Sequence, residues 1–309
     1  MPDEVLITHK LLQSCEDAID AKFTAHRLYD QSDRDAFLAE VGPRIRAIAG
    51  GGVDPALMDK LPNLEMISNF GVGYDSIDTD AARQRNISVT NTPDVLNDAM
   101  AEITIGLMVS LARRLPQADQ YVRAGKWPEA GFPLQSELTG KTVGIVGLGR
   151  IGKEIAARCL AMKMRVVYFG RNKQLNQPYI YYNTLTDMAR DADWLVVITP
   201  GGAGTNKLIN REVLDALGPD GYLVNMARGT VVDEPVLVDY LKSGKIAGAA
   251  LDVFEAEPKI PAELFDLDNV VLSPHQGSAT HQTRYAMGAL VVANLAAHFA
   301  GEPLLTRVV

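Results

Sequence analysis

Residues whose side chains can bind anions or transfer protons come directly after apolar, strand-like runs in the second half of the chain. Arg228 follows the run YLVNMA, Asp252 ends GAAL, and His275 follows VVLSP. Thr199 and Pro200 follow a further run, WLVVI. The carboxyl ends of parallel strands meet at one edge of an open α/β sheet, where ligands bind. These residues are therefore expected to lie together.

The chemistry available to this set is carboxylate binding and proton donation. The planar guanidinium of Arg228 stays charged and offers two parallel donors to a carboxylate. A surface ion pair is the alternative, but it fits poorly directly after an apolar strand. His275 beside a carboxylate can hold a proton at neutral pH and deliver it as a general acid. Spacing leaves that carboxylate open between Glu255 and Glu257 in DVFEAEP.

A glycine pattern in GIVGLGRIG predicts a dinucleotide site. Gly147, Gly149 and Gly152 follow a predicted strand and open a predicted helix, the context that distinguishes a dinucleotide fingerprint from a chance glycine turn. The phosphates would meet the free amides and positive dipole end of that helix. A nicotinamide hydride, a carboxylate anchor and a proton donor together indicate reduction of a 2-keto acid.

The turn after the second strand of this region, in VVYFGRNKQ, carries bases instead of an acid. It begins at Gly170, 18 residues after Gly152, where an NAD enzyme usually presents Asp or Glu to the ribose 2′-hydroxyl. Arg171, Asn172 and Lys173 can instead bind a 2′-phosphate. The turn predicts NADPH over NADH, and solubility of an exposed turn is the alternative.

Short β-rich runs alternate with helical patterns along the whole chain, which predicts an α/β fold with parallel sheets. Strands are expected at residues 5–7, 44–49, 65–69 and 87–90, and then at 142–146, 165–169, 194–199, 221–226, 247–253 and 270–273. The six later strands predict a complete doubly wound sheet. Long helices are expected from about residue 98 and over 282–300. They separate a lobe of residues 1–98 and 282–309, predicted to bind substrate, from a dinucleotide-binding domain of residues 99–281.

Composition excludes several classes of protein. A chain of 309 residues with 47% hydrophobic residues can bury two cores. The net charge of −8 provides no positive field for nucleic acid or an anionic membrane. Two separated cysteines, without CxxC spacing, indicate neither disulfides nor zinc, and Cys159 falls at a core position of a helix. No signal peptide or membrane span is predicted, so the cytoplasm is the expected location.

The irregular stretch of residues 125–139 is a predicted contact between subunits. It contains Phe132 and Leu134 within the run PEAGFPLQSELTG, and Trp127 directly before that run. Long loops without structure of their own are often functional, and apolar side chains on such a loop favour a partner surface over the alternative that the segment folds back on its own chain.

The whole chain resembles the D-isomer-specific 2-hydroxyacid dehydrogenases. The motifs that carry this resemblance occur in the family order: NFGVGYDSID, NTPDVLNDAMAEITIGLMVSLAR, GKTVGIVGLGRIG, NMARGTVVDEPVL, ALDVFEAEP and LSPHQGSAT. The resemblance implies two Rossmann-like domains, the substrate lobe being of flavodoxin type, with a deep cleft, closure on binding and a homodimer. It also implies that Arg228, Glu257 and His275 are catalytic, which selects Glu257 over Glu255.

The resemblance implies further site residues. Backbone amides of Val72 and Gly73 would meet the substrate carboxylate, together with Arg228 and His275. Asp252 would hold the nicotinamide carboxamide. The full set of expected cofactor contacts is Gly147, Leu148, Gly149, Arg150, Ile151, Gly152, Arg171, Asn172, Lys173, Thr199, Pro200, Thr205, Met226, Ala227, Asp252, His275 and Gly277.

Within the family, NTPDVLNDAMAE and the GRNK turn look most like glyoxylate/hydroxypyruvate reductases and the related hydroxyphenylpyruvate reductases. Phosphoglycerate dehydrogenase is an alternative, weakened because the chain ends without a regulatory domain. The sequence departs from many relatives at Asn97 and Gln276, and Gln276 beside His275 could alter substrate preference. A dinucleotide-sensing binding protein is the competing class, and the complete Arg, Glu and His set favours the enzyme.

Overall fold

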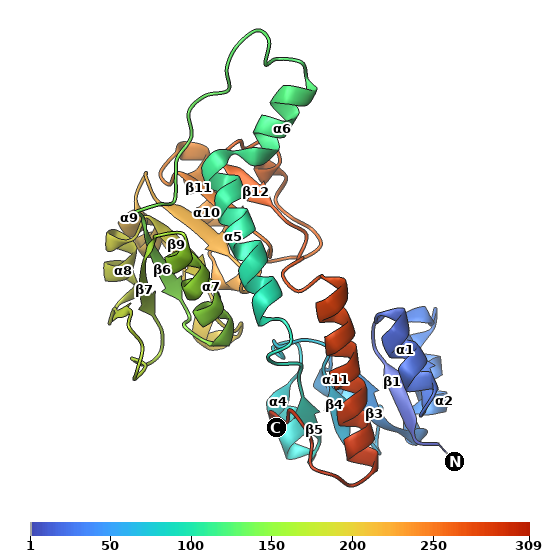
Figure 1. The fold of residues 1–309 in the computed structure, drawn as a ribbon. Coiled ribbons are helices and arrows are strands. Elements are labelled where there is room, and N and C mark those ends of the chain that lie inside the picture. The colour runs from blue at the N-terminus through green and yellow to red at the C-terminus, as the bar shows by residue number, and fades with distance from the viewer. Residues whose placement is uncertain (1) are drawn as a thin grey trace. The chain divides into compact units, whose positions relative to one another are not determined.

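The computed structural model describes residues 2–309, and the chain divides into two compact units (Figure 1). Unit 1 comprises residues 2–96 and 280–309, and unit 2 comprises residues 97–279. Both units are α/β with a parallel sheet, as predicted for the fold class. We predicted that residues 1–98 and 282–309 bind the substrate and that residues 99–281 bind the dinucleotide. These two binding functions remain proposals.

Unit 1 is built on a five-stranded parallel sheet with the order β2-β1-β3-β4-β5. This is the flavodoxin order, in which the strand sequence reverses between β1 and β3. Ligands of such sheets bind beyond the carboxyl ends of the strands near the reversal. The strands are β1 (Glu4–Ile7), β2 (Thr24–Arg27), β3 (Ile45–Ala49), β4 (Met66–Ser68) and β5 (Ser88–Thr90).

Helices cover both faces of this sheet, so alternate residues of each inner strand enter two separate cores. Leu6, Ile48 and Ile67 pack with α2, α3 and α4 on one face. Val5 and Ile7 pack with α1 and α11 on the other. The helices are α1 (Gln13–Asp20), α2 (Arg34–Val41), α3 (Pro55–Asp59), α4 (Thr79–Gln84) and α11 (His281–Phe299), with short 3₁₀ turns η1 (Leu28–Asp30) and η2 (Gly42–Arg44).

Sequence patterns located four of the five strands and both long helices, but they missed β2. The sequence TAHR of β2 has no alternation of apolar and polar residues, and none of its residues is fully buried. An edge strand that pairs on one side only needs little apolar surface. Asp54 followed by Pro55 is a sequence typical of a helix start, and α3 begins there, because the Asp54 side chain caps the helix by accepting from Leu57 N at 2.8 Å.

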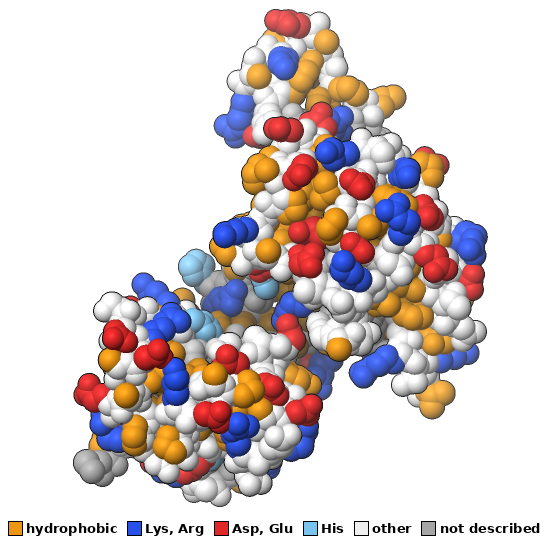
Figure 2. All heavy atoms as spheres, turned by 180° about the vertical axis from the view of Figure 1, so that it is seen from behind, with side chains coloured by type: hydrophobic (Ala, Val, Ile, Leu, Met, Phe, Trp, Pro, Cys, Tyr) orange, Lys and Arg blue, Asp and Glu red, His pale blue; other side chains and the backbone are white. Residues whose placement is uncertain are grey.

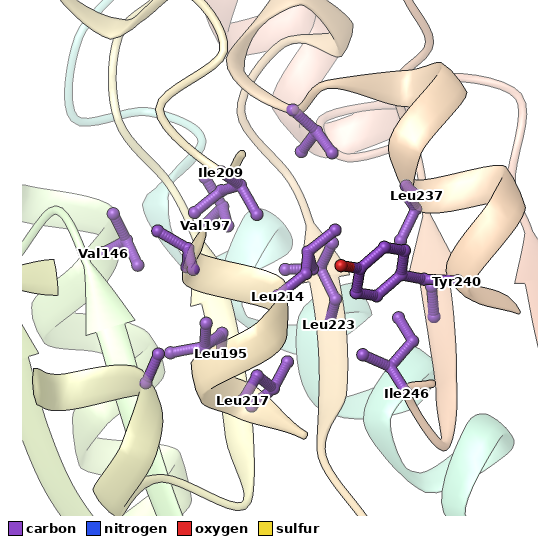
Figure 3. Close-up of a cluster of buried hydrophobic side chains, with 14 of the residues drawn as sticks. Val146, Leu195, Val197, Ile209, Leu214, Leu217, Leu223, Leu237, Tyr240 and Ile246 are labelled. Carbon is purple, nitrogen blue, oxygen red and sulfur yellow. The ribbon is translucent and has the colours of Figure 1, made fainter. Parts of the chain in front are cut away.

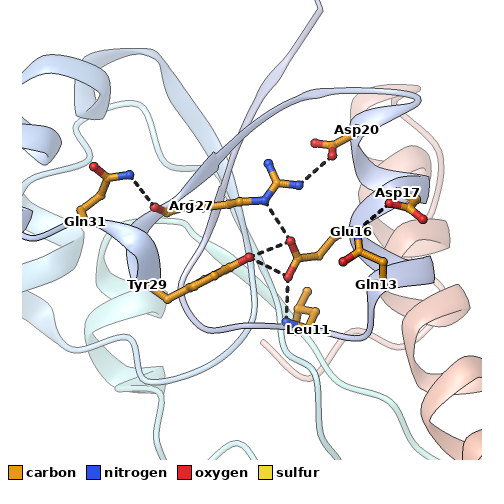
Figure 4. A network of polar contacts seen from close by, with 8 residues as sticks. All are labelled: Leu11, Gln13, Glu16, Asp17, Asp20, Arg27, Tyr29 and Gln31. Carbon is orange, nitrogen blue, oxygen red and sulfur yellow. Dashed lines mark hydrogen bonds and ion pairs between the residues drawn. The ribbon is translucent and has the colours of Figure 1, made fainter.

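A buried carboxylate joins α1 to the edge of the sheet (Figure 4). Glu16 is 4% exposed and accepts hydrogen bonds from Leu11 N at 2.9 Å, Arg27 Nε at 2.9 Å and the Tyr29 hydroxyl at 2.8 Å. Burial alone would raise the pKa of Glu16, but these donors outweigh it and lower the pKa. The charged form is therefore the one that stabilises the fold.

We expect Glu16→Gln to destabilise unit 1 by about 2 kcal/mol at pH 7, because an amide loses charge-assisted hydrogen bonds and leaves buried donors poorly matched. A group with a lowered pKa stabilises the fold above its unfolded pKa and loses that contribution as the pH falls. The difference in free energy of unfolding between Glu16→Gln and wild type should thus shrink as the pH falls below 4.5, the ordinary pKa of a glutamate. Urea midpoints at pH 7 and pH 4 measure this. Asp17→Asn, at an exposed position on the same helix, is the control, and an equal loss there would contradict the assignment.

Unit 2 is built on a seven-stranded parallel sheet with the order β12-β11-β10-β9-β6-β7-β8. The order reverses between β6 and β9, which is the point where doubly wound folds bind dinucleotides. The strands are β6 (Thr142–Val146), β7 (Arg165–Phe169), β8 (Ile180–Tyr181), β9 (Trp194–Val197), β10 (Tyr222–Asn225), β11 (Gly248–Leu251) and β12 (Val270–Leu272).

Two hydrophobic cores lie on opposite faces of this sheet, which explains why its central strands read as continuous apolar runs. On one face Val146, Val197 and Leu223 pack with Leu214 and Tyr240 (Figure 3). The other core includes Cys159, which is fully buried, as predicted, and whose burial raises the pKa of its thiol to about 12.

Helices of unit 2 supply the outer layers. α8, α9 and α10 contribute to the first core, and α5 and α7 contribute to the second. The helices are α5 (Asn97–Arg113), α6 (Leu115–Arg123), α7 (Arg150–Ala161), α8 (Leu185–Asp191), α9 (Arg211–Leu217) and α10 (Glu234–Ser243), with 3₁₀ turns η3 (Ala203–Thr205), η4 (Gly229–Val231) and η5 (Ala262–Leu264).

The prediction of six strands in unit 2 was wrong by one, because the sheet has a seventh strand, β8. Only two residues of β8 pair with β7, a length too short for any periodicity to register. The missed strand is nevertheless important for the site, since Tyr181 in β8 contacts the basic turn that follows β7.

The stretch after α6 is irregular, as predicted, and exposes apolar side chains. Trp127 is 67% exposed and Leu134 is 101% exposed. The stretch folds back on α6, where the ring centroids of Tyr121 and Phe132 lie 5.4 Å apart and the Tyr121 hydroxyl donates to Ala130 O at 2.7 Å. Its apolar side chains thus have a defined arrangement at the surface.

Acidic and basic side chains are interspersed over the face shown in Figure 2. Among residues 2–309, no helix is both long and apolar enough to cross a membrane. No cluster of His, Cys, Asp or Glu in the same part of the chain could hold a metal ion.

Candidate active site

Arg228 lies in the turn that leaves β10, and a buried asparagine shapes that turn. Asn225 is 1% exposed; its side chain accepts from Ala227 N at 3.1 Å and donates to Arg228 O at 3.1 Å. The Arg228 guanidinium donates to Ala227 O at 2.8 Å. The side chain of the last strand residue therefore fixes the backbone that presents the guanidinium.

His275 and Glu257 form a hydrogen-bonded pair at the same edge of the sheet. His275 Nδ1 lies 2.7 Å from Glu257 Oε2. A carboxylate only accepts, so Nδ1 carries the proton and Nε2 is left for another partner. Glu257 Oε1 accepts from Phe254 N at 2.9 Å, which orients the carboxylate. His275 has φ +52°, a left-handed conformation that a non-glycine residue adopts at some cost and that is common at functional sites.

Glu255, the other candidate carboxylate, makes no such contact. Its backbone N–H donates to Glu234 Oε2 at 3.0 Å, and burial raises the pKa of Glu234. This contact ties the loop after β11 to the start of α10. Glu257 is therefore the residue that the fold pairs with His275, in agreement with the choice that the family resemblance implies.

Gly229 brings the Arg228 turn against the loop that carries Glu257. A Cβ at Gly229 would lie 1.8 Å from the Phe254 carbonyl carbon and 2.2 Å from Glu255 N. No side chain fits there without moving the backbone. Arg228 and Glu257 are thus positioned relative to each other by direct backbone contact between two strand-end loops.

Asp252 organises the turn that presents His275. It is 1% exposed, and its side chain accepts from the Ser273 hydroxyl at 2.6 Å, Gln276 N at 2.7 Å and Gly277 N at 2.8 Å. The backbone N–H of His275 donates to Asp252 O at 2.9 Å. Three acceptor positions of the carboxylate are therefore used within the fold. The predicted contact between Asp252 and a nicotinamide carboxamide would use the remaining acceptor position, and this contact stays a prediction.

The three glycines of the fingerprint have distinct geometric roles at the end of β6. Gly147 has φ +106°, and a Cβ there would lie 3.0 Å from Ile198 O, between β6 and β9. A Cβ at Gly152 would lie 2.3 Å from Gly147 O, so this glycine lets α7 pack on the turn. A Cβ at Gly149 would meet nothing within 4 Å, which leaves open space where the pyrophosphate is expected.

Two further features show that these residues fit a dinucleotide. Gly149 is the N-cap of α7 and no side chain caps that end of the helix, so its first amides are available to phosphate. The Thr199 hydroxyl, beyond β9, is buried and without a hydrogen-bond partner among residues 2–309. A buried polar atom of this kind indicates a missing ligand or water.

The basic turn after β7 is held at both ends by two tyrosines. The Tyr181 hydroxyl donates to Gly170 O at 3.2 Å, and Gln174 N donates to the Tyr168 hydroxyl at 2.9 Å. The two rings pack with centroids 5.2 Å apart. The Gln174 side chain also donates to Leu148 O in the glycine-rich loop. Arg171, Asn172 and Lys173 between these ends are all exposed.

The other predicted cofactor residues occupy the same edge in different ways. The Thr205 hydroxyl donates to Pro200 O at 2.8 Å and closes the loop after β9. The side chains of Leu148, Met226 and Ala227 are buried in the two cores of unit 2, so the predicted contacts of these residues with the cofactor would have to be made by their backbones. Gly277 packs closely on Met100: a Cβ at this position would lie 2.4 Å from Met100 Sδ, so the methionine side chain would have to shift. Arg150 is exposed and Ile151 is half-buried at the start of α7.

Val72 and Gly73 belong to unit 1, in the loop after β4. Asn69 donates to Gly71 O at 3.0 Å and to Gly73 O at 2.8 Å, and Asn91 donates to Val72 O at 2.9 Å. Two asparagine side chains thus bind the carbonyls of this loop. The N–H groups of Val72 and Gly73 have no acceptor among residues 2–309, and two successive amides of this kind can both donate to an anion.

Comparison with known proteins identifies the family. Residues 105–277 match the family described as "D-isomer specific 2-hydroxyacid dehydrogenase, NAD binding domain". The chain belongs to this family. As a D-2-hydroxyacid dehydrogenase it is an enzyme that uses a nicotinamide dinucleotide, and the glycine-rich turn of β6 and α7 is the part of the chain that fits that cofactor.

Named relatives of this dehydrogenase span nearly its whole length. It is 48% identical over 297 residues to the hydroxyphenylpyruvate reductase of Plectranthus scutellarioides, which covers 95% of each chain. It is 45% identical over 308 residues to glyoxylate/hydroxypyruvate reductase A HPR2 of Arabidopsis thaliana, covering 99% of this chain and 98% of that protein. The NADPH-dependent glyoxylate/hydroxypyruvate reductase of Sinorhizobium meliloti, solved with NADP and malonate, has a TM-score of 0.96 and 43% identity, covering 100% of this chain and 97% of that one.

Several positioning residues of this dehydrogenase were missed by sequence reasoning. Asn225 and Glu234 act through buried polar contacts, and Gly229 acts through a close backbone approach. In the sequence, these three residues are marked only by their place in NMARGTVVDEP, near Arg228, which had already been selected as a site residue. An asparagine at the end of an apolar strand and a glycine after the functional arginine are cues that could have been used.

Proposed function

We propose that the protein reduces a small 2-keto acid of the glyoxylate or hydroxypyruvate type to the D-2-hydroxy acid with NADPH. The observation that carries this proposal is the His275–Glu257 pair, 2.7 Å apart, next to the Arg228 turn at the sheet edge that also bears the dinucleotide fingerprint. The Arabidopsis relative and the Sinorhizobium structure, both named glyoxylate/hydroxypyruvate reductase, support the same substrate class.

Each residue has a defined role in the proposed reaction. Arg228 and the amides of Val72 and Gly73 bind the substrate carboxylate. His275 donates a proton from Nε2 to the carbonyl oxygen, and Glu257 orients the ring through Nδ1 and stabilises its positive charge. The bound nicotinamide supplies the hydride that C2 of the substrate receives.

A panel of keto acids, followed by NADPH and NADH consumption, tests the proposal. Glyoxylate, hydroxypyruvate, pyruvate and 4-hydroxyphenylpyruvate should be included, because the Plectranthus relative is a hydroxyphenylpyruvate reductase. That relative makes a bulkier keto acid the second candidate, and 3-phosphohydroxypyruvate tests the phosphoglycerate alternative. If no keto acid in the panel is reduced although the dinucleotide binds, a dinucleotide-sensing protein becomes the better explanation.

The basic turn is proposed to select NADPH over NADH. Arg171 and Lys173 can neutralise a 2′-phosphate, and no carboxylate stands at the turn to repel it. Tyr168 and Tyr181 hold the turn in one conformation, so its donors are preorganised and little order is lost on binding.

We expect Arg171→Ala to lower the ratio of kcat/KM for NADPH to that for NADH by about tenfold, the size of one charge-assisted contact. The value for NADH should change little, because NADH has no 2′-phosphate. Arg190→Ala is the control, since Arg190 is exposed on α8 and pairs with Asp187. A wild-type ratio of one or less, or an unchanged ratio in Arg171→Ala, would contradict the proposed role of the turn.

A homodimer is proposed to form through α6 and the irregular stretch of residues 125–139. None of the residues of α6 is buried, and Trp127 and Leu134 are exposed beside it. Single exposed apolar residues are common, but large ones gathered on one segment indicate an interface.

The double variant Trp127→Ser/Leu134→Ser should shift the wild-type dimer toward monomer, because two large apolar anchors are removed from the proposed interface. Light scattering after size-exclusion chromatography gives the mass over a range of concentrations. Leu175→Ser is the matched control, since Leu175 is 86% exposed but lies outside this segment. A monomeric wild type, or a double variant that dimerises as tightly as wild type, would contradict the assignment.

A further inference from the structure

The segment that follows α11 pairs with the edge of the unit 1 sheet. Residues 305–309 turn back along β5 (Figure 1), where Val308 N donates to Val89 O at 2.8 Å. An isolated bridge pairs Arg307 with Thr90 in the antiparallel direction. Since β5 is an edge strand, this segment satisfies backbone groups that the sheet itself leaves open. It also runs beside the residues that leave β5.

Thr306, in this segment, is bound by a buried asparagine of α11. Asn294 is 0% exposed, and its amide nitrogen donates to Leu290 O and to Thr306 Oγ1, both at 2.9 Å. Its amide oxygen accepts from Leu305 N at 3.0 Å and from Thr306 N at 3.3 Å. Two donors and two acceptor positions are all that an asparagine side chain offers. Asn294 is therefore fully used, and it holds Thr306 against α11 in one orientation.

Thr306 in turn holds the residue that follows β5. Its hydroxyl accepts from Asn294 and donates to Asn91 O at 2.6 Å. Asn91 is 7% exposed, and its backbone N–H donates to Thr306 O at 3.3 Å. Thr306 and Asn91 thus each donate to the other, which fixes the backbone of Asn91 relative to α11.

Asn91 and Thr92 bind the two carbonyls that set the direction of the Val72 and Gly73 amides. The Asn91 side chain donates to Val72 O at 2.9 Å, and Thr92 N donates to Gly71 O at 3.0 Å. Both peptide bonds of this loop are trans, so the carbonyl and the N–H of each plane point in opposite directions. Holding Val72 O therefore aims the Gly73 N–H, and holding Gly71 O aims the Val72 N–H.

We propose that Thr306 is a positioning residue for substrate binding, which acts through Asn91 on the amides of Val72 and Gly73. The inference rests on the proposed function, in which these amides bind the substrate carboxylate. It deepens that function by assigning a role to a residue 215 positions away from Asn91 in the sequence. Thr306 itself does not contact the substrate. Donors that are already aimed at an anion lose little order when it binds, so loss of the Thr306 contact weakens substrate binding.

Thr306→Val tests this role, because valine keeps the shape of the side chain and removes the hydroxyl. KM for glyoxylate should rise by about fivefold, the effect of one hydrogen bond, while kcat stays within about twofold of that of wild type. The reason is that the carboxylate is bound in the same way before and during hydride transfer, so its contacts act on KM. Thr306→Ser keeps the hydroxyl and should return KM to the wild-type value.

Thr79→Val is the matched control. Thr79 is half-buried on α4 of the same unit, and its hydroxyl forms no hydrogen bond with any of residues 2–309. KM and kcat of this variant should equal those of wild type. An unchanged KM in Thr306→Val, a fall in kcat as large as the rise in KM, or a Thr306→Ser variant as defective as Thr306→Val would overturn the inference.

A second variant tests the path from Thr306 to the loop. Asn91→Ala removes the donor to Val72 O but keeps the backbone contacts of residue 91 with Thr306. It should raise KM by about the same factor as Thr306→Val, and the double variant should raise it no further, because both changes break one chain of hydrogen bonds. If the two effects multiply instead, the residues act independently and the inference is wrong.

Amide hydrogen exchange distinguishes a failure of this inference from a failure of the proposed function. The Thr92 N–H is bonded to Gly71 O, so its exchange rate in the ligand-free protein, followed by NMR, measures how firmly the loop is held. Exchange should be about fivefold faster in Thr306→Val than in wild type, and unchanged in Thr306→Ser and Thr79→Val. A wild type that reduces no keto acid contradicts the proposed function. The exchange rate then still decides whether Thr306 holds the loop, and equal rates in Thr306→Val and wild type would refute it.

Discussion

Alanine in place of His275 should lower kcat for keto-acid reduction by ~10²-fold or more, the usual contribution of a positioned general acid. The imidazole is the proton donor in the proposed reaction, and no other histidine shares the Glu257 carboxylate. Dinucleotide binding should stay close to that of wild type, because the fingerprint residues lie on β6 and α7. Steady-state turnover and cofactor-induced thermal stabilisation measure the two effects separately.

His281→Ala provides a matched control for this loss. His281 is exposed at the start of α11, six residues further along the chain, and the proposed reaction gives it no role. Near-wild-type turnover in the His275 variant would refute the assignment of His275. A similar loss of turnover in both variants would show that the effect is not specific to the proton donor.

Glu257→Gln should lower kcat by about ten- to a hundredfold. The amide keeps the size of the side chain and can accept from His275 Nδ1, but it removes the negative charge that stabilises the protonated ring. Glu257 also accepts from Phe254 N, a bond that the amide oxygen can retain in only one of its two orientations. KM for the keto acid should change less than kcat, because Arg228 still binds the carboxylate.

Glu255→Gln tests the alternative that spacing alone left open. Glu255 is two residues away on the same loop, is exposed, and contacts Glu234 only through its backbone. Turnover of this variant should stay within about twofold of wild type, the range expected for a surface substitution without a partner. A larger loss from Glu255→Gln than from Glu257→Gln would reverse the assignment of the two carboxylates.

Local patterns in the sequence were sufficient for most of the fold because they have local physical causes. Asp54 and Pro55 predict the start of α3, and the helix begins there. Apolar runs predict the central strands, since strands buried on both faces must be apolar throughout. The edge strands β2 and β8 escaped prediction, because pairing on one side with few buried residues leaves no periodic pattern.

The functional groups were also identified from their positions after strands, but their contacts were not. Asp252 was expected to face the cofactor, and the structure shows three of its acceptor positions occupied by the turn that carries His275. Tyr168 and Tyr181 hold the basic turn although they lie 13 positions apart in the sequence. Such contacts depend on side-chain directions and loop paths that no spacing rule encodes.

The sequence by itself determined the α/β class, the dinucleotide turn and the residue types available for chemistry, because each follows from short-range preferences of glycine, proline and apolar residues. Only the tertiary structure showed the contact between His275 and Glu257, which spacing left open and the family resemblance implied, and only it showed why Gly229 can carry no side chain and that Arg284 lies over Phe70. These facts join residues 18, 25 and 214 positions apart in the chain. Contacts over such separations are set by how strands and helices pack, and packing is a property of the whole fold.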